Sequence, residues 1–386
     1  MHKLVLNWGI CITTRALSRL SYYSPGGVLC PNLEQLVWEF DWSHLPLFYT
    51  RLFFSPSLKH ITLSTSFISP TLRPEVLGPL TEAVSCLPTS LEYLSLVCGL
   101  GGEPLRGAIS SFVCRSGSSL RSFGSSEPLS EAAFNHLMQL PNLRSWAVYE
   151  PLRTLPPAPF PSLEELRLGP GGLPWLHLLA AHGDDQTRDG LAPPPAMLNT
   201  NVKATLKILN LPRNTPVDPM LLSLISSFRN LVTLCVENYY CNKEGSCVFR
   251  LTDDDVENLA VTLPSLVSLQ LGRVCNSNAC HTSLSSLLSV SIHCLGLELL
   301  EIHFTTQAIV DNIQRLLDED PGRDKPRCKL RSLLVGYLPL QVCREDVGKV
   351  AIGLAYIFPC LKKISGVFSD SDEGRSWECV ASELQG

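Results

Sequence analysis

Three consecutive aspartates, Asp253 to Asp255, form the densest acidic cluster in the chain, and carboxylates this close together could hold a hard metal ion. A calcium loop would also need alternating oxygen ligands, a glycine and a terminal glutamate, and this stretch has none of them. Thr252 instead stands at an N-cap position, and Asp255 completes a capping box in which Asp replaces the usual Glu. Asp253 and Asp254 fall in the first turn, where the helix dipole favours negative charge. The triplet therefore predicts the start of a helix and no metal site.

Cysteine and histidine are the other residues that could do chemistry, at fifteen and nine copies. One group is Cys235, Cys241, Cys247, Cys275, Cys280 and His281. Zinc sites normally carry C-x₂₋₄-C pairs, and the nearest approach is the C-x₄-C from Cys275 to Cys280. A zinc site on two converging loops is the least favoured alternative. We interpret these cysteines as reduced thiols, because free cysteine behaves as a small buried hydrophobe.

Motifs of catalysis and phosphate binding are absent from the sequence. There is no G-x-S-x-G elbow, no S-x-x-K set and no H-E-x-x-H. The stretch GLGGEP (99–104) lacks a G-K-[ST] ending and predicts a turn between a strand and a helix. We therefore expect no enzyme, no cofactor and no bound metal.

Composition bounds the partners and the compartment. The formal charge of −5 argues against nucleic acid, whose binding proteins are usually strongly basic. No apolar run is long enough for a transmembrane helix, so we expect no membrane partner. The odd number of cysteines, without a regular framework and without an N-x-[ST] sequon, favours a reduced intracellular protein, cytoplasmic or nuclear.

The segment after the aspartates, PSLVSLQL (264–271), has relatives along the chain. Twelve segments match a loose L-x-x-L-x-L template, and six of them begin with proline. Their first apolar positions run from Leu33 to Leu361, 328 residues in eleven steps, so the mean period is about 30 residues. Helical i, i+3, i+4, i+7 patterns separate the segments. They cover residues 75–87, 129–140, 219–228, 253–263, 281–295, 307–320 and 344–358.

This alternation predicts an α/β fold. We expect a leucine-rich-repeat-like solenoid, a horseshoe with a parallel sheet on the concave face and helices on the convex face. A single array of about twelve repeats would fill residues 1–386, with clear repeats over 31–368. Residues 1–30 would be an N-terminal cap or truncated repeat, and residues 369–386 a C-terminal tail or cap. Three insertion loops are predicted, over 169–202, 238–250 and 319–328.

The repeat unit resembles that of a known family. The segments LTDDDVENLAVTLPSLVSLQL (251–271), LSEAAFNHLMQLPNLRSWAV (129–148) and FSDSDEGRSWECVASEL (368–384) are similar to fungal F-box proteins with degenerate leucine-rich repeats. In that family an N-terminal F-box docks a Skp-type adaptor of a cullin ubiquitin ligase, and the repeats hold the substrate. The resemblance, over about Pro31 to Leu384, implies substrate recognition for such a ligase.

Residues 1–30 lack an F-box-like L-P-x-E-[IV]-L-x-x-I-F start. A Skp-type adaptor is therefore an expected partner only where an F-box precedes the chain. The alternative is a leucine-rich-repeat scaffold or adaptor protein with no ligase link.

Strand alternation predicts which side chains meet a protein partner. In the L-x-x-L-x-L unit the leucines point into the core, and the alternate positions face the concave side. The set mixes aromatic residues with both signs of charge, a composition suited to protein recognition. The predicted partner-binding residues are Gln35, Glu39, His60, Tyr93, Tyr149, Glu165, Arg167, Thr233, Glu237, Gln270, Glu301, His303 and Lys363.

Overall fold

The computed structural model describes most of the chain. The described residues are 3–6, 14–23, 27–40, 47–65, 73–98, 102–149, 160–169, 172–181, 200–212, 215–236, 249–272, 282–305, 309–319, 327–335, 346–366 and 372–384. They form two compact units. The first contains residues 1–172 and 190–202, and the second contains residues 173–189 and 203–386.

The described part of the first unit contains a parallel sheet in which every strand pairs with the next one along the chain. Its strands are β1 (Lys3–Leu6), β2 (Gln35–Phe40), β3 (His60–Thr65), β4 (Tyr93–Val97), β5 (Ser122–Ser125), β6 (Ser145–Val148) and β7 (Glu165–Leu168). Parallel neighbours need a crossover between them. That crossover returns the chain to the same end of the sheet, so that the next strand runs in the same direction.

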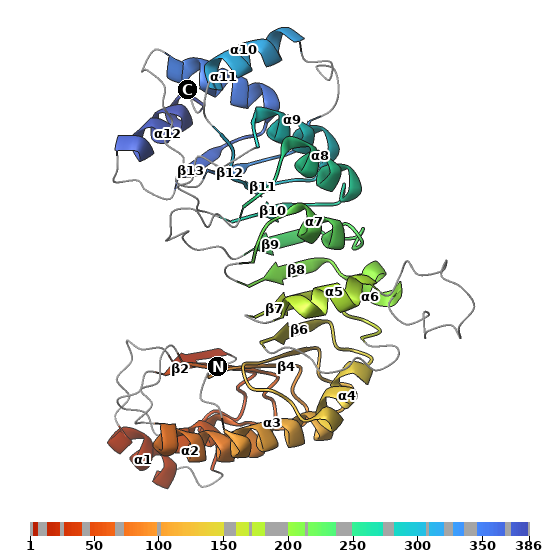
Figure 1. The fold of residues 1–386 in the computed structure, drawn as a ribbon. Helices are drawn as coiled ribbons and strands as arrows, with labels where there is room; N and C mark the ends of the chain where they lie inside the picture. The colour runs from red at the N-terminus through yellow and green to blue at the C-terminus, as the bar shows by residue number, and fades with distance from the viewer. Residues whose placement is uncertain are drawn as a thin grey trace, which may run out of the picture. The chain divides into compact units, whose positions relative to one another are not determined.

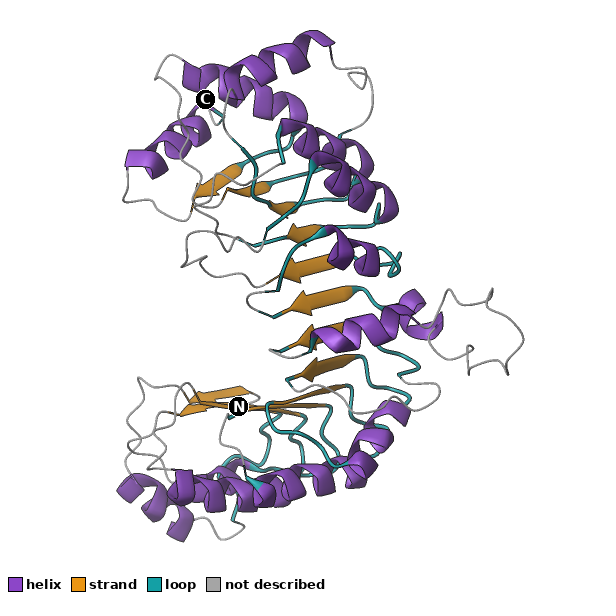
Figure 2. Ribbon diagram, viewed as in Figure 1, coloured by secondary structure: helices purple, strands orange, loops and turns teal. Residues whose placement is uncertain are grey.

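Helices supply these crossovers. They are α1 (Thr14–Tyr23), the 3₁₀ helix η1 (Leu47–Phe53), α2 (Arg73–Ser85), α3 (Glu103–Arg115) and α4 (Glu131–Gln139). Figures 1 and 2 show α2, α3 and α4 in a row along one face of the sheet, and neighbouring helices pack on each other. We call the opposite face of strands β2 to β7 the open face, because no described helix covers it.

The alternation of leucines explains which side is core. In β4, Leu94 and Leu96 are buried toward the helices, whereas Tyr93, Ser95 and Val97 are partly exposed on the open face. A strand places successive side chains on opposite faces, so one face buries leucine and the other is left for polar residues. Burial of apolar area on the helix side is the main driving force for the fold.

A backbone ladder sets the spacing at the start of each strand. The amides of Lys59 and His60 both donate to the Glu34 carbonyl, at 2.9 Å each. The same two-to-one pattern recurs at β4 to β7 and at β9 to β13, ending with the Lys362 and Lys363 amides on the Arg331 carbonyl. It satisfies the carbonyls that precede the strands, so each repeat is positioned on the one before it.

The described part of the second unit repeats this architecture. Its strands pair in parallel and in chain order. They are β8 (Ile208–Leu211), β9 (Thr233–Val236), β10 (Ser268–Gln270), β11 (Leu299–Glu301), β12 (Ser332–Val335) and β13 (Lys363–Gly366). Its helices are α5 (Leu173–Ala181), α7 (Pro219–Ile225), α8 (Asp253–Thr262), α9 (Leu284–His293), α10 (Ile309–Glu319), α11 (Val347–Ile357) and α12 (Asp372–Glu383). The short helix α6 (Thr200–Thr205) lies where the two units divide.

The predicted fold class is confirmed: the chain is an α/β solenoid of the leucine-rich-repeat type. All twelve template segments form strands, β2 to β13, and all seven helical patterns form helices. The sequence reading missed β1, α1 and α12, and it gave no bounds for α3, the helix that it expected after the turn at 99–104. It also placed an insertion loop over 169–202, where α5 and α6 lie, and residues 182–199 of that stretch are outside the described part. Most of the predicted insertions 238–250 and 319–328 falls outside it as well. The single twelve-repeat organisation stays a prediction.

Candidate functional site

The acidic triplet is a structural start signal, as predicted. The Asp255 amide donates to Thr252 Oγ1 at 3.3 Å, and the Thr252 amide donates to Asp255 Oδ2 at 2.9 Å, which completes the capping box of α8. Asp253 does more than the sequence indicated. Its carboxylate accepts hydrogen bonds from the Ser283 amide and hydroxyl, both at 2.7 Å, and from the Ser286 hydroxyl at 2.5 Å. The acid therefore joins the start of α8 to the start of α9.

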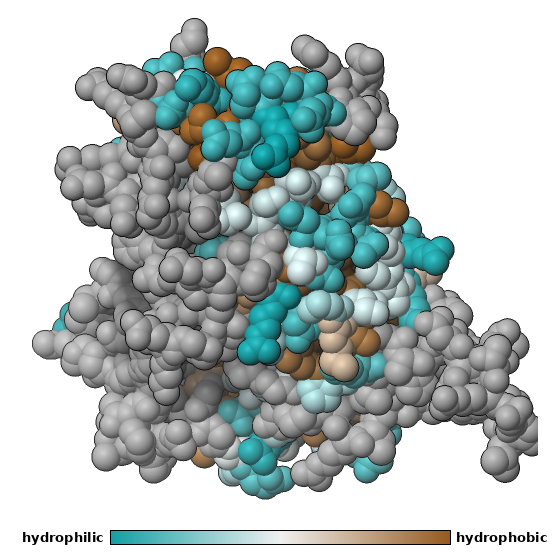
Figure 3. Space-filling view, turned by 45° about the horizontal axis from the view of Figure 1, so that its top comes forward, coloured by the Kyte–Doolittle hydropathy of each residue, from teal (hydrophilic) through white to brown (hydrophobic). Residues whose placement is uncertain are grey.

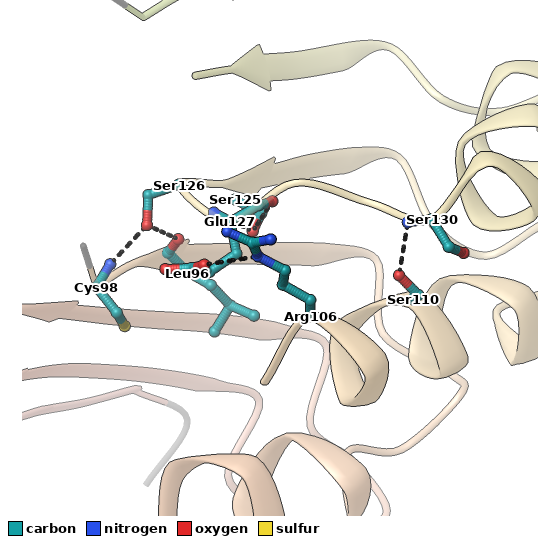
Figure 4. A network of polar contacts seen from close by, with 8 residues as sticks. All are labelled: Leu96, Cys98, Arg106, Ser110, Ser125, Ser126, Glu127 and Ser130. Carbon is teal, nitrogen blue, oxygen red and sulfur yellow. Dashed lines mark hydrogen bonds and ion pairs between the residues drawn. The ribbon is translucent and has the colours of Figure 1, made fainter. Parts of the chain in front are cut away.

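A second polar network lies between β4, α3 and the segment that links β5 to α4 (Figure 4). The Ser126 hydroxyl accepts from the Cys98 amide at 3.0 Å, and the buried Glu127 carboxylate pairs with Arg106 Nε at 3.7 Å. The Ser130 amide donates to the Ser110 hydroxyl at 2.9 Å. The two hydrogen bonds satisfy polar groups between neighbouring repeats, the ion pair offsets the buried charge of Glu127, and we interpret the network as structural.

Three buried cysteines, Cys98, Cys294 and Cys328, are not activated. Burial, with a smaller contribution from the charge of Glu127, raises the pKa of the Cys98 thiol to about 12. Burial likewise raises the pKa of Cys294 to about 12 and that of Cys328 to about 11. Only the thiolate is a nucleophile or metal ligand, so these thiols are inert at neutral pH.

The zinc hypothesis falls largely outside the described residues. Cys241, Cys247, Cys275, Cys280 and His281 all lie there, and only Cys235 of that group is described. Within the described part of the chain, no three His, Cys, Asp or Glu side chains are grouped so as to hold a metal ion.

Seven of the predicted partner-binding residues belong to the open face of the first unit. They are Gln35, Glu39, His60, Tyr93, Tyr149, Glu165 and Arg167. The strand register aligns Gln35 with His60, and His60 with Tyr93. The His60 and Tyr93 rings are stacked, with centroids 5.9 Å apart and an interplanar angle of 25°. The structure therefore brings residues from distant repeats into one surface.

Three predicted residues, Thr233, Gln270 and Lys363, are accessible on the sheet of the second unit. Gln270 Nε2 donates to the Ser268 hydroxyl at 3.1 Å, and the Cys235 thiol contacts Gln270 Oε1 at 3.8 Å. Glu237 lies outside the described residues.

Glu301 and His303 need a correction. Both were predicted to be accessible on the sheet, but they are only 3% and 2% exposed. The His303 ring lies against the Phe249 ring, with centroids 5.9 Å apart, and the Thr282 hydroxyl donates to the His303 carbonyl at 2.5 Å. Alternation gave the side of the strand but not what covers it, so neither residue is an accessible recognition group.

Small residues occupy the centre of the open face, a feature that the sequence reading missed. On β5 and β6 the open-face positions are Ser122, Gly124, Ser145 and Ala147, which we call the small-residue floor. A Cβ added at Gly124 would lie 3.1 Å from the Ala147 Cβ, so neighbouring positions are already in close contact. Ser122, Ser145 and Ala147 are half-buried and Gly124 is buried, so the floor is only partly accessible.

Arg167 is the fixed cation at this floor. Its Nε donates to Glu165 Oε1 at 2.6 Å, and its side chain is 57% exposed. Burial alone would lower the pKa of the Arg167 guanidinium, but the hydrogen bond and charge of Glu165 raise that pKa above its ordinary value. Tyr93 and Tyr149 contribute to the pKa of Arg167 in the same direction. Glu165 and Arg167 thus form an ion pair on the open face of β7, with Tyr149 at the end of the neighbouring β6 and Tyr93 on β4.

Glycine at position 169 is required by Tyr149. A Cβ on Gly169 would lie 2.5 Å from the Tyr149 ring and 2.8 Å from its Cα, and a backbone atom cannot move aside cheaply. We expect Gly169→Ala to lower the free energy of unfolding by about 1–3 kcal/mol through overpacking and to displace Tyr149. Urea unfolding measures the first effect, and a crystal structure of the variant measures the second. Gly107→Ala, inside α3 with no atom within 4 Å of the added Cβ, is the control. It should be neutral or stabilise the protein by about 0.5–1 kcal/mol, and equal losses for both variants would contradict the close fit at Tyr149.

The remaining described surface shows no large apolar patch in the view of Figure 3, where hydrophobic residues lie in small separate groups. Exposed large apolar side chains include Tyr22 and Tyr23 on α1, Met220 on α7 and Ile352 on α11. Scattered apolar residues of this kind are normal on a protein surface. Among the described helices, none has the length and apolar character needed to cross a bilayer.

Comparison with known proteins leaves the fold as the firmest assignment. No family model and no curated protein matches the chain. Among solved structures it is similar to the Rad7 and Elc1 complex from yeast, at 16% identity and a TM-score of 0.40, over 82% of this chain and 74% of that chain. It is also similar to an internalin (InlF) from Listeria monocytogenes, at 13% identity and a TM-score of 0.27, over 94% of this chain and 87% of that chain. The fold assignment stands on the strand order and helices of the chain itself.

Proposed function

We propose that this chain is a non-enzymatic module that binds another protein on the open face of its first unit. The observation that carries the proposal is the cluster of Tyr93, Tyr149 and Arg167 beside the small-residue floor. Tyrosine and arginine are the residues that most often dominate binding energy, and here they serve no core. Parallel-sheet faces of repeat arrays are extended surfaces suited to such use.

Substitution of these three residues by alanine tests the proposal. The variant Tyr93→Ala/Tyr149→Ala/Arg167→Ala should lose at least about 10-fold in partner affinity, because hot-spot truncations each cost roughly 2 kcal/mol or more. The measurement is affinity purification from cells with quantitative mass spectrometry, followed by titration of the identified partner. The matched control removes the same residue types elsewhere, as Tyr22→Ala/Tyr23→Ala/Arg144→Ala. Tyr22 and Tyr23 are 84% and 76% exposed on α1. Loss in the control with full retention in the cluster variant would place binding elsewhere.

A finer role is substrate recognition for an F-box-type ubiquitin ligase, in the cytoplasm or nucleus. Its support is the resemblance of the repeat unit, most of all residues 251–271, to fungal F-box proteins with degenerate leucine-rich repeats. The full gene product should then co-purify with a Skp-type adaptor, and deleting the gene should raise the abundance of the bound protein. No adaptor and unchanged abundance would favour the alternative, a scaffold or adaptor with no ligase link.

A further inference from the structure

Helix α1 exposes an apolar stripe, which we call the α1 stripe. Its residues Ala16, Leu20 and Tyr23 recur at i, i+4 and i+7, so they lie along one side of the helix. Ala16 is exposed, and the exposed fractions of Leu20 and Tyr23 are 47% and 76%. Leu17 lies on the adjoining side and is only 1% exposed. The helix therefore buries one side in its own repeat and presents a second apolar side to solvent.

This grouping is unlike the other exposed apolar side chains on the described helices. Met220 on α7 and Ile352 on α11 stand alone on their helices, whereas α1 carries Leu20, Tyr22 and Tyr23 within four residues. The Tyr22 and Tyr23 rings meet edge to face, with centroids 5.3 Å apart. Apolar side chains that are grouped, unlike isolated ones, mark interaction surfaces.

The position of α1 explains what kind of element fits the stripe. Helix α2 packs on η1 at one side and on α3 at the other, and α3 likewise packs on α2 and α4. Among the described helices, α1 packs only on η1, and Figure 1 shows it at one end of the row. One side of α1 therefore has no helical neighbour within the described part of the chain. The i, i+4, i+7 spacing of the stripe is the spacing by which helices pack on each other.

The charge of α1 indicates the chemistry of that neighbour. The charged residues of this helix are Arg15 and Arg19, and the sequence contains no Asp or Glu before Glu34. Arg19 lies one turn before Tyr23, so the two side chains are neighbours on the helix surface. The Arg19 side chain is exposed and forms no ion pair with a described residue. A cation thus flanks the α1 stripe.

The acids of the adjoining elements do not neutralise this cation. Glu82 of α2 is already paired, with Arg51 of η1 at 2.6 Å. Glu34 and Glu39 belong to the segment of β2, in the sheet and not in the row of helices. The helix side of the first repeat is therefore basic beside its apolar stripe, and an acidic, apolar surface complements it.

We propose that the α1 stripe binds an acidic amphipathic helix of a partner protein, whose apolar residues pack on Leu20 and Tyr23 and whose carboxylates pair with Arg19. A second copy of α1 is disfavoured, because it would bring Arg15 and Arg19 against the same residues of the first copy. A bilayer surface is disfavoured as well, since interfacial helices present a broader apolar face than one residue per turn. Because α1 belongs to the row of helices, this surface is separate from the open face, and binding there does not depend on the proposed function.

The probe is a phage-displayed library of helical peptides of about 18 residues, long enough for a marginally stable helix. Leucine is fixed at i, i+4 and i+7, the flanking positions are random, and selection is on the full chain. Enriched peptides should carry Glu or Asp beside the leucines. Arg19→Glu should weaken binding of a synthetic enriched peptide about 5-fold, and changing the matching Glu of the peptide to Lys should restore it. Leu20→Ala/Tyr23→Ala should weaken binding about 10-fold or more.

Arg315→Glu is the matched control. Arg315 is an exposed arginine on the amphipathic helix α10, so its reversal changes the net charge equally and should change peptide binding by less than about 2-fold. The urea midpoints of the Arg19, Leu20/Tyr23 and Arg315 variants should match that of the native chain, because all four side chains are exposed. The Tyr22→Ala/Tyr23→Ala/Arg144→Ala variant should lose these peptides and keep the partner of the open face.

Several results would overturn the proposal. One is a selection that enriches no peptide, or peptides without acidic positions. Another is an acidic peptide whose affinity is insensitive to Arg19→Glu or falls equally with Arg315→Glu. Dimerisation in sedimentation that Leu20→Ala/Tyr23→Ala abolishes would assign the stripe to a second copy. Binding to phosphatidylserine vesicles that Arg19→Glu abolishes would assign it to a lipid surface.

Discussion

Replacing Asp253 by alanine is expected to lower the free energy of unfolding by about 2–4 kcal/mol. The carboxylate accepts three hydrogen bonds, from the Ser283 amide and the Ser283 and Ser286 hydroxyls. Hydrogen bonds to charged groups contribute roughly 1.5–3 kcal/mol each, and those of one network overlap. Ser286 is fully buried, so its hydroxyl would lose its acceptor without gaining water.

The loss of Asp253 should first destabilise α9 and, through α9, the whole protein. Ser283 is the N-cap of α9, where its hydroxyl accepts from the Ser285 amide at 3.1 Å. Without Asp253 this cap loses its anchor to α8, and repeat proteins derive much of their stability from contacts between neighbouring units. Hydrogen–deuterium exchange followed by mass spectrometry should show faster exchange in α9, and urea unfolding should show the loss of stability.

Asp254 provides the matched control for this prediction. It is the adjacent aspartate in the same first turn, it is exposed, and its carboxylate has no hydrogen-bond partner among the described residues. Asp254→Ala should therefore cost only the interaction with the helix dipole, about 0.3–1 kcal/mol. Equal losses for Asp253→Ala and Asp254→Ala would mean that the triplet acts through its charge alone and that the bonds to α9 contribute nothing.

The same triplet shows how far sequence reasoning reaches. The capping box of Thr252 and Asp255 was predictable because its partners are three residues apart and its geometry is local. The bond from Asp253 to Ser283 spans 30 residues. The template steps vary between 20 and 43 residues, so no fixed offset indicates which residue of the next repeat lies beside a given helix start.

At the candidate site, too, local features could be predicted from the sequence and contacts between repeats could not. Leucine alternation predicted the side of the strand for Tyr93, Tyr149 and Arg167, because that depends only on the two-residue period. Their common cluster depends on strand register across three repeats and on the small residues between them. Ser122-Phe-Gly-Ser125 in β5, with a glycine at an open-face position, is the sequence signal that could have indicated the floor, since strand glycine often marks a close approach of other groups.

The alternation of residues along a strand could not predict which side chains are exposed to solvent. Glu301 and His303 occupy the same alternate positions as the accessible residues, yet Phe249, more than 50 positions earlier, lies against the His303 ring. Whether a sheet face is open depends on chain that packs over it, and the lengths and paths of irregular segments are not encoded by periodicity. The physical consequence is that Glu301 and His303 are buried in the second unit, whereas Thr233, Gln270 and Lys363 of the same unit remain accessible.

Removal of the indole beneath the floor should have the largest effect on the first unit. Trp146 is 4% exposed on the core side of β6, between Ser145 and Ala147 of the floor. Its ring packs on Phe160 at a centroid distance of 4.6 Å and on Phe134 at 5.8 Å. Trp146→Ala should lower the free energy of unfolding by about 3–5 kcal/mol, as expected when a buried aromatic residue leaves a cavity. Urea unfolding followed by far-UV circular dichroism measures the loss.

The substitution should also weaken partner capture, although it changes no side chain of the open face. Phe160 has a φ of 60°, a left-handed conformation that costs energy for a bulky residue and that is maintained here by packing against Trp146. Once the indole is gone, Phe160 can relax and β6 loses its support, so the floor and Tyr149 shift together. Trp146→Phe keeps an aromatic ring in the core and should show a smaller loss of both stability and capture. A smaller loss of unfolding free energy for Trp146→Ala than for Trp146→Phe would contradict the packing argument. Partner capture at the native level in Trp146→Ala would mean that binding does not depend on the position of β6, and that the floor is not the surface on which the partner lies.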